Sequence, residues 1–173
     1  QQLLRLDDVL SIQAALEENR AGLRKLPGTV LKNQQTGEVV YEPPQDPAEI
    51  ERLMNNFLEH FHRKETDDLD PLVRMAVLHY QFESIHPYLD GNGRLGRMLV
   101  ALLLDHWRLL KSPMLYLSLY LKRNQAAYYR WLGAIRTEGD WVGWLRFFLF
   151  CVAEIAEDAA RTEPDFLCRV VEA

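Results

Sequence analysis

Apolar and polar residues follow one another along much of this chain with the spacing of an α-helix. The clearest helix start lies at Asp46 and Pro47, where an N-capping carboxylate precedes a proline at the first helical position and Glu49 follows as the reciprocal carboxylate. The apolar positions after it recur at intervals of three and four residues and predict one buried stripe: Ile50, Leu53, Met54, Phe57, Leu58 and Phe61.

The same signals recur further along the chain and predict an all-α helical bundle. Asp70 and Pro71 start a helix that leads to Ile85, the apolar run Met98–Leu104 predicts a core helix, and the opening segment Leu6–Asn19 also has helical character. Two more buried stripes are predicted, the second of them capped by Asp140: Tyr128, Trp131, Leu132 and Ile135, and then Trp141, Trp144, Leu145, Phe148, Val152 and Ile155. We expect all four tryptophans to serve packing.

One segment departs from the helical pattern. Thr29–Lys32 and Glu38–Tyr41 are short β-prone runs on either side of Asn33–Gly37, which predicts a hairpin with glycine in its turn. Two strands alone are marginal, so the hairpin must lean on the helices. We expect one domain over residues 1–173, with an N-terminal helix at about 3–20, the hairpin at about 29–42, a helical core at about 47–160 and a C-terminal extension at 161–173.

Composition narrows the class of protein. The 173 residues are 48% apolar, enough for a substantial core, and the net charge of −5 argues against a nucleic-acid surface. No apolar run approaches the roughly 18 residues of a membrane helix. Cys151 and Cys168 form no metal or disulfide pattern, which fits a reducing compartment. The chain opens on Gln1 without a secretory signal, so we expect a fragment of a longer, cytoplasmic protein.

The segment His86–Arg97, His-Pro-Tyr-Leu-Asp-Gly-Asn-Gly-Arg-Leu-Gly-Arg, concentrates the chemistry of the chain. His86 can exchange a proton near neutral pH, Asp90 can hold Mg²⁺ through oxygen, and arginines can fork onto phosphates. Pro87 should end the preceding helix at His86, and the glycines should open a cup of backbone N–H groups at the start of the next helix. Such a helix start favours an anion, so the segment predicts a polyphosphate site.

Three other interpretations use the same residues. Gly91, Gly93 and Gly96 spell a dinucleotide fingerprint, but that motif requires a strand before it, and the preceding segment has helical character. His79, Glu83 and His86 share a helical face and could form a metal triad, although His79 lies in an apolar stretch and Pro87 lifts His86 off the helix. The third interpretation is a polar turn between two buried helices with solvated arginines.

The segment resembles the signature of the Fic family, H-P-F-x-D/E-G-N-G-R-x-x-R, and departs from it only at Tyr88, which stands for phenylalanine. The helix predicted over Pro71–Ile85 resembles the family's preceding helix. Downstream, Leu115–Leu121, the pair Tyr128-Tyr129 and Gly139-Asp140-Trp141 are similar to its later helices, so the likeness runs from about Pro27 to Ala160. Tyr88 keeps an aromatic ring that can anchor the loop, but its hydroxyl then needs a partner.

The resemblance implies a protein adenylyltransferase, a nucleotidyltransferase that moves AMP from ATP to a Ser, Thr or Tyr hydroxyl of a target protein and releases pyrophosphate. It implies ATP as co-substrate and Mg²⁺ as cofactor, with His86 as general base and Asp90 as the metal ligand. The phosphate-binding residues it implies are Asn92 with the backbone of Gly91 and Gly93 for the α-phosphate, and Arg94 and Arg97 for the β- and γ-phosphates.

The resemblance also implies where other groups bind. In the family such a hairpin is a flap that binds the target's backbone by strand addition, here through Val30, Leu31, Val39 and Val40; a mere connecting hairpin is the alternative. On the adenine side the expected residues are Tyr129, Asn124 and Arg136, while the helical stripe assigns Tyr128 to the core.

Related proteins are commonly restrained by a helix bearing Ser/Thr-x-x-x-Glu, whose glutamate pairs with the second motif arginine, here Arg97. No Ser or Thr of this chain has Glu four residues later, so we expect the inhibitory helix upstream of Gln1 or on a separate chain.

Other reactions of this scaffold, namely phosphoryl transfer, phosphocholine transfer or removal of AMP, stay open, as do a nucleotide-sensing module without catalysis and a homo-oligomer. Gly93 favours AMP transfer, because the phosphoryl-transfer branch typically replaces it.

Overall fold

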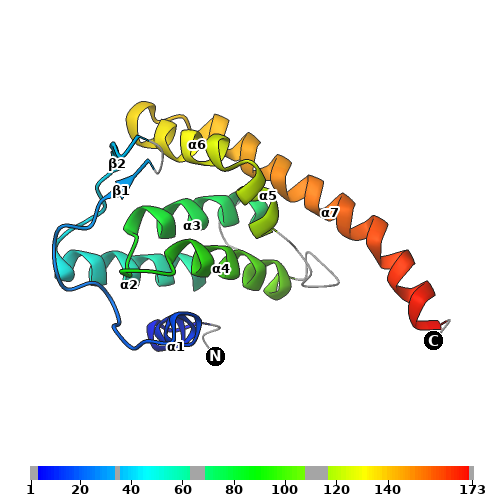
Figure 1. Ribbon diagram of the computed structural model, residues 1–173, viewed down its shortest axis with the longest axis horizontal. Coiled ribbons are helices and arrows are strands. Elements are labelled where there is room, and N and C mark those ends of the chain that lie inside the picture. The colour runs from blue at the N-terminus through cyan, green and yellow to red at the C-terminus, as the bar shows by residue number, and fades with distance from the viewer. Residues whose placement is uncertain (1–3, 34–35, 63–68, 108–116, 172–173) are drawn as a thin grey trace. The chain divides into compact units, whose positions relative to one another are not determined.

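The computed structural model describes residues 4–33, 36–62, 69–107 and 117–171. In these ranges it contains seven helices and one two-stranded sheet, which confirms the all-α prediction with its hairpin (Figure 1). The chain forms two compact units, residues 1–100 and 101–173. None of the described helices is both long and apolar enough to cross a membrane.

The first unit is built on α1 (Leu6–Glu17), α2 (Pro47–His62), α3 (Pro71–Ile85) and the first part of α4 (Asn92–His106). Both predicted helix starts are confirmed: Asp46 Oδ1 accepts from Ala48 N at 3.2 Å, and Asp70 Oδ1 accepts from Leu72 N at 2.8 Å. The α1 helix ends at Glu17, two residues before the predicted end at Asn19.

Helices α2 and α3 pack on each other through the stripe predicted from the sequence. The rings of Phe57 and Phe82 lie 5.7 Å apart, and all members of the stripe in α2 are buried except Leu53, which is half-buried. Helix α1 packs against α2. The loop between α3 and α4 is therefore held between helices with well-formed cores.

The hairpin is shorter than predicted. Strand β1 is Leu31–Lys32 and β2 is Val39–Tyr41, paired antiparallel with an irregularity beside Leu31. Gly37 has φ of 73°, as the turn prediction requires, while residues 34 and 35 of the predicted turn lie outside the described ranges. The hydroxyl of Tyr41 donates to the carbonyl of Ser84 at 2.8 Å, so the hairpin leans on the end of α3.

The second unit contains the end of α4, α5 (Leu117–Arg123), α6 (Gln125–Glu138) and α7 (Trp141–Val171). The two predicted stripes meet where Tyr128 and Trp144 pack with ring centroids 6.1 Å apart. Helix α7 runs beyond residue 160, so the predicted extension continues the helix. The free thiol of Cys151 is buried, and burial raises its pKa to about 12.

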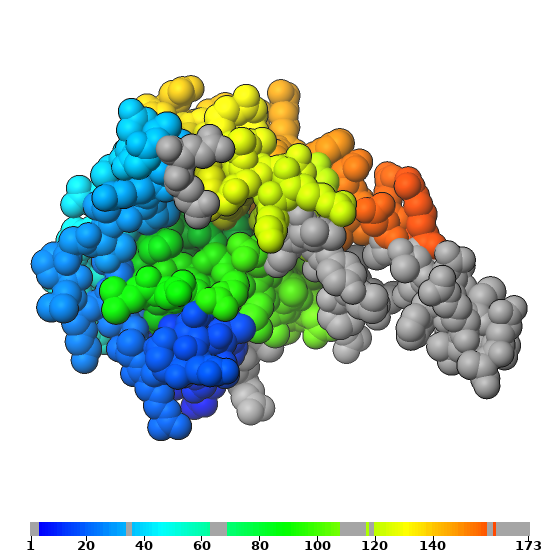
Figure 2. All heavy atoms as spheres, viewed as in Figure 1, coloured from blue at the N-terminus to red at the C-terminus, as the bar shows by residue number. Residues whose placement is uncertain are grey.

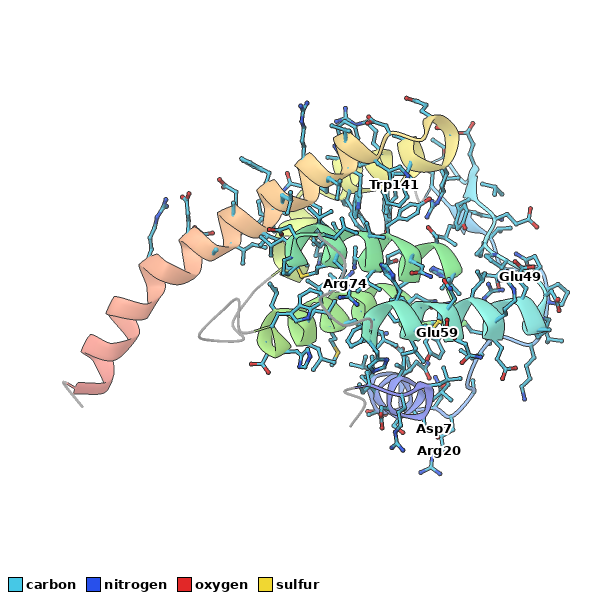
Figure 3. The ribbon with its side chains drawn as sticks, turned by 180° about the vertical axis from the view of Figure 1, so that it is seen from behind. Asp7, Arg20, Glu49, Glu59, Arg74 and Trp141 are labelled. Atoms are coloured by element: carbon cyan, nitrogen blue, oxygen red, sulfur yellow. The ribbon has the colours of Figure 1, made fainter. Side chains whose placement is uncertain are left out.

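The packing prediction was wrong for Trp141. It is 39% exposed although it shares a helical face with Trp144, because it is the first residue of α7, where fewer neighbours cover that face. Trp107, Trp131 and Leu145 are half-buried. Figure 3 shows Trp141 at the start of α7 and Arg74 among the helices of the first unit.

Candidate functional site

His86 lies at the C-cap of α3, where the sequence predicted the helix to end. Its N–H donates to Phe82 O at 3.0 Å, and its backbone adopts the left-handed conformation, with φ of 48° and ψ of 58°. Pro87 disfavours the right-handed helical conformation for the residue before it, which explains why α3 stops there. A left-handed residue with a Cβ is uncommon and costs free energy, so surrounding contacts must hold it.

The turn after His86 is organised by Asn92. The amide of Asn92 accepts from Tyr88 N at 2.9 Å and donates to Tyr88 O at 2.7 Å, and the residue is only 3% exposed. The side chain is thus committed to the backbone of the loop, and a phosphate contact from Asn92 would come from its backbone N–H. Among the residues described, Tyr88 finds no partner for its buried hydroxyl, and burial raises its pKa well above the ordinary value.

The two glycines predicted to open the turn behave differently. Gly91 has φ of 83°, a conformation that favours glycine, and it is the residue before α4. We also expected Gly93 to use the freedom of glycine to adopt positive φ, but its φ is not positive and it lies in the first turn of α4. Its missing Cβ matters for another reason, since a Cβ there would lie 3.0 Å from Nη1 of Arg97. The guanidinium of Arg97 therefore folds back over the start of the helix.

Asp90 is exposed at the tip of the loop. One of its oxygens accepts from Gly91 N at 2.7 Å. A single exposed carboxylate fits Mg²⁺, which usually takes one or two protein carboxylates and completes its shell with phosphate and water oxygens. No group of three His, Cys, Asp or Glu side chains able to hold a metal occurs among the described residues.

Neither the metal triad nor the dinucleotide fingerprint finds support. His79 is buried, its Nδ1 lies 3.4 Å from Gly96 O, and burial lowers its pKa to about 4, so the imidazole is neutral at neutral pH. Gly96 lies in α4 against Glu83, because a Cβ at Gly96 would lie 2.5 Å from Glu83 Oε1. The glycine-containing loop follows a helix instead of a strand, and Gly96 serves helix packing.

A carboxylate that the sequence did not single out reaches into the loop. Nη2 of Arg94 lies 2.6 Å from the carboxylate of Glu17, at the end of α1. The Glu17 side chain is only 8% exposed, and a Cβ on Gly91 would lie 2.3 Å from its Oε1. Figure 2 shows the atoms of α1 adjoining those of α4 at the surface. An anion therefore already occupies the space beside Arg94 and Gly91, where the sequence predicted a phosphate.

The expected adenine-side residues lie on or beside α6 in the second unit. Tyr128 is buried, as the helical stripe predicted, and Tyr129 is 52% exposed; its place beside adenine stays a prediction. Asn124 precedes α6 and donates to Tyr120 O at 3.1 Å, and Arg136 lies in the last turn. Tyr129 and Arg136 are seven residues apart and share one helical face.

The expected flap residues differ in exposure. Val39 and Val40 in β2 are 55% and 58% exposed, whereas Leu31 and Val30 are half-buried. Val30 precedes β1 instead of belonging to it. Exposed apolar side chains on a short edge strand suit contact with an extended peptide.

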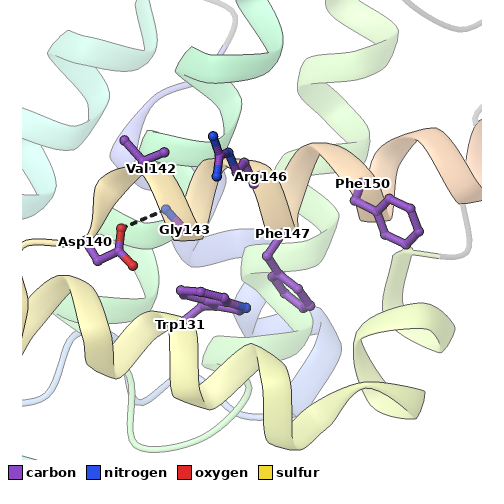
Figure 4. Close-up of a pocket in the computed structure, with 7 residues that line it drawn as sticks. All are labelled: Trp131, Asp140, Val142, Gly143, Arg146, Phe147 and Phe150. Carbon is purple, nitrogen blue, oxygen red and sulfur yellow. Dashed lines mark hydrogen bonds between the residues drawn. The ribbon is translucent and has the colours of Figure 1, made fainter.

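The second unit also contains a pocket of about 520 Å³ between α6 and α7 (Figure 4). Aromatic and aliphatic side chains dominate its walls, and its carboxylate, Asp140, accepts from Gly143 N at 2.8 Å. None of the site residues predicted from the sequence lines it: Trp131, Asp140, Val142, Gly143, Arg146, Phe147 and Phe150 do.

Comparisons with known proteins support the family resemblance that the segment His86–Arg97 suggested. A model of the Fic/DOC family matches residues 3–104, a match that begins well before the segment that sequence motifs had indicated and includes α1. Proteins named protein adenylyltransferase Fic from Drosophila grimshawi and Drosophila mojavensis are each 32% identical over 108 residues, or 62% of this chain. That stretch is only 21% and 20% of their own lengths.

Solved structures share the fold. The crystal structure of a Fic family protein from Desulfovibrio desulfuricans G20 matches with a TM-score of 0.77 and 26% identity, over 92% of this chain and 48% of that one. Fic-1 (residues 134–508) from C. elegans matches with a TM-score of 0.65 over 94% of this chain and 45% of that one. At 21% identity, the second likeness concerns the fold alone.

Proposed function

The chain belongs to the Fic/DOC family, and from that premise we propose that it transfers AMP from ATP to a hydroxyl group of a target protein, with release of pyrophosphate. The observation that carries the proposal is the meeting of His86, at the end of α3, with the start of α4 in one short loop. That loop combines a group able to accept a proton with a helix start that favours phosphate.

His86 is the proposed general base. The hydroxyl oxygen of the target forms a bond to the α-phosphorus, the bond from that phosphorus to the bridging oxygen of pyrophosphate breaks, and the imidazole takes the hydroxyl proton. A protein hydroxyl is a weak nucleophile until a base accepts its proton, so this step needs a group like His86.

The remaining loop residues bind the nucleotide in this proposal. The backbone N–H groups at Gly91, Asn92 and Gly93 face the α-phosphate, and Arg94 and Arg97 offset the charge that develops on the leaving pyrophosphate. Asp90 would hold Mg²⁺, which when bound supplies further neutralisation of phosphate charge.

Glu17 adds a condition to nucleotide binding. Its carboxylate pairs with Arg94 and lies over Gly91, so an incoming phosphate must displace it. The guanidinium of Arg97, which the family resemblance makes the partner of an inhibitory glutamate, lies beside Gly93. The inhibitory helix expected upstream of Gln1 or on another chain stays a prediction.

Two contacts outside the loop complete the proposal. Tyr129 is sufficiently exposed to stack on adenine, with Asn124 and Arg136 on the same helix or its cap. Val39 and Val40, together with Leu31 and Val30, would receive the backbone of the target protein through the hairpin edge.

The experiment that tests the proposal compares three labelled donors incubated with this chain and a native protein lysate. Relative to the same lysate incubated with His86→Ala, which accounts for the lysate's own kinases, ATP labelled at the α-phosphate should label additional proteins, whereas ATP labelled at the γ-phosphate and CDP-choline labelled in choline should add no label. Label from the γ-phosphate alone would indicate phosphoryl transfer, and label from choline would indicate phosphocholine transfer. No incorporation from any donor, with ATP binding retained, would indicate a nucleotide-sensing module, and each of these results contradicts the proposal.

A further inference from the structure

Arg24, in the segment after α1, is buried against the end of α3. It is 2% exposed, and its Nε donates to His86 O at 2.7 Å. Its Nη2 donates to Pro44 O at 2.6 Å and to Ile85 O at 3.4 Å, while its backbone N–H donates to Pro87 O at 2.9 Å. One residue thus holds the carbonyl groups on both sides of the His86–Pro87 peptide.

These contacts satisfy a general requirement of helix ends. The last carbonyl groups of a helix lack partners within it, and a cation is favourable there because the helix dipole is negative at that end. The groups that accept from Nε and Nη2 of Arg24 are all backbone carbonyls. Burial lowers the pKa of Arg24, but arginine keeps its charge in proteins.

The contacts also explain how His86 keeps an uncommon backbone conformation. A left-handed histidine persists only where its surroundings over-determine it. The N–H of His86 is held by Phe82 O, and its carbonyl is held by Arg24. The direction of the Cα–Cβ bond follows the backbone. A change in the φ and ψ of His86 would therefore displace its imidazole.

The same guanidinium reaches the chain that leaves the hairpin. Pro44 lies three residues after β2, and its carbonyl accepts from the nitrogen, Nη2, that also contacts Ile85 O. A planar guanidinium with fixed donor directions can hold three carbonyls in one arrangement, which the single ammonium of lysine cannot reproduce. Arg24 therefore fixes the hairpin exit and the His86 peptide to a common point.

We propose that Arg24 is the positioning residue of His86. It holds the backbone of His86 in its left-handed conformation, and thereby holds the imidazole in the orientation that proton transfer requires. This inference rests on the proposed role of His86 as general base. Arg24 acts through the backbone and contacts neither nucleotide nor target in this proposal.

The test compares Arg24→Lys with a matched control, Arg74→Lys. Arg74 is also buried, and its Nη2 donates to the carbonyls of His60 and Phe61 near the end of α2, away from the loop. We expect Arg24→Lys to lower kcat for AMP transfer by roughly 10- to 100-fold with KM for ATP changed less than about threefold, because misplaced groups lose rate more than binding. Arg74→Lys should lower Tm but leave kcat unchanged below the unfolding range.

Chemical rescue supplies a second measurement. Added guanidinium ion at millimolar concentration should restore part of the kcat of Arg24→Ala and none of any loss in Arg74→Ala. Equal kcat in Arg24→Lys and the unmodified chain would overturn the proposal. So would a failure of Arg24→Lys to fold while Arg74→Lys folds, since Arg24 would then serve stability alone.

A readout that does not depend on activity separates this inference from the proposed function. The imidazole C–H signal of His86 can be assigned among the five histidines by its loss in His86→Asn. Arg24→Lys should shift that signal and Arg74→Lys should not. If the chain transfers no AMP but the signal shifts as expected, the proposed function fails and the positioning contact stands; an unchanged signal overturns the positioning role.

Discussion

Two helix-to-helix connections in this chain solve the same backbone problem differently. Helix α6 ends at Gly139, which adopts the left-handed conformation with φ of 69°, and the next residue, Asp140, caps α7 through Gly143 N. Helix α3 also ends on a left-handed residue, but that residue is His86, and the position before α4 is Gly91. The first connection has glycine at its left-handed helix end and a capping carboxylate at the next helix start, whereas the second has histidine at the left-handed end and a glycine, which carries no capping side chain, at the next start.

The α3–α4 connection is locally less stable than the α6–α7 connection. Glycine at a left-handed position carries no Cβ penalty, and an aspartate at an N-cap satisfies backbone N–H groups that glycine cannot. In the α3–α4 connection, Arg24 supports the strained end and the carboxylate of Glu17 lies beside the uncapped start. Departures from local preference that need support from distant residues are typical of functional sites.

The largest expected effect comes from removing the imidazole at the strained end. His86→Ala should lower AMP transfer by about 100-fold or more, because a general base typically contributes 10²- to 10⁴-fold, while ATP binding measured by calorimetry stays within about threefold.

His86→Gly is the informative companion variant. It should be equally inactive but more stable than His86→Ala by about 1 kcal/mol, since glycine adopts the left-handed conformation without strain. Near-normal transfer by either variant would rule out His86 as the base. His106→Ala, in the exposed last turn of α4, is the activity control.

The next effect concerns the glycine before α4. Gly91→Ala should lower the free energy of unfolding by about 1 to 2 kcal/mol, because its φ of 83° strains any residue with a Cβ and Glu17 must move aside. Denaturant unfolding gives the measurement.

Gly133→Ala is the matched control. Gly133 lies inside α6 with open space where a Cβ would be, so alanine there should stabilise the chain by about 0.5 to 1 kcal/mol. A neutral Gly91→Ala would show that the loop can adopt another backbone conformation.

A smaller effect is expected from the carboxylate beside the uncapped helix start. Glu17→Gln removes the charge that pairs with Arg94, and ATP should bind about fivefold more tightly, the equivalent of a partly exposed ion pair worth about 1 kcal/mol. Glu49→Gln, which breaks an exposed pair with Arg52, should leave ATP affinity unchanged. Weaker ATP binding by Glu17→Gln would indicate that Glu17 supports the nucleotide instead of competing with it.

The smallest functional effect belongs to the well-capped connection. Asp140→Ala should lower the free energy of unfolding by about 1 kcal/mol through loss of the cap on α7. ATP affinity should stay the same, because this cap lies at the start of α7 and not in the loop proposed to bind the nucleotide. Asp140→Asn should restore most of the stability; altered ATP affinity in either variant would contradict the division between the two connections.

Sequence patterns predicted most of the fold because they record local physical preferences. The starts of α2 and α3 follow from an aspartate and a proline in succession, and the stripe of α2 follows from helical periodicity. The strands came out shorter than predicted, since strand length depends on pairing partners instead of propensity alone. Trp141 was placed in the core for a related reason, because periodicity does not decide which residue at the helix start faces solvent.

By itself, the sequence determined the chemistry of His86–Arg97 and the helix ends around it, since proline, glycine and capping residues act on their immediate neighbours. Only the tertiary structure decided that Glu17 pairs with Arg94 and that Arg24 holds the carbonyl of His86. These contacts join residues 77 and 62 positions apart. Neither residue type nor spacing records such contacts, because they depend on how α1 and the segment after it pack against the ends of α3 and α4.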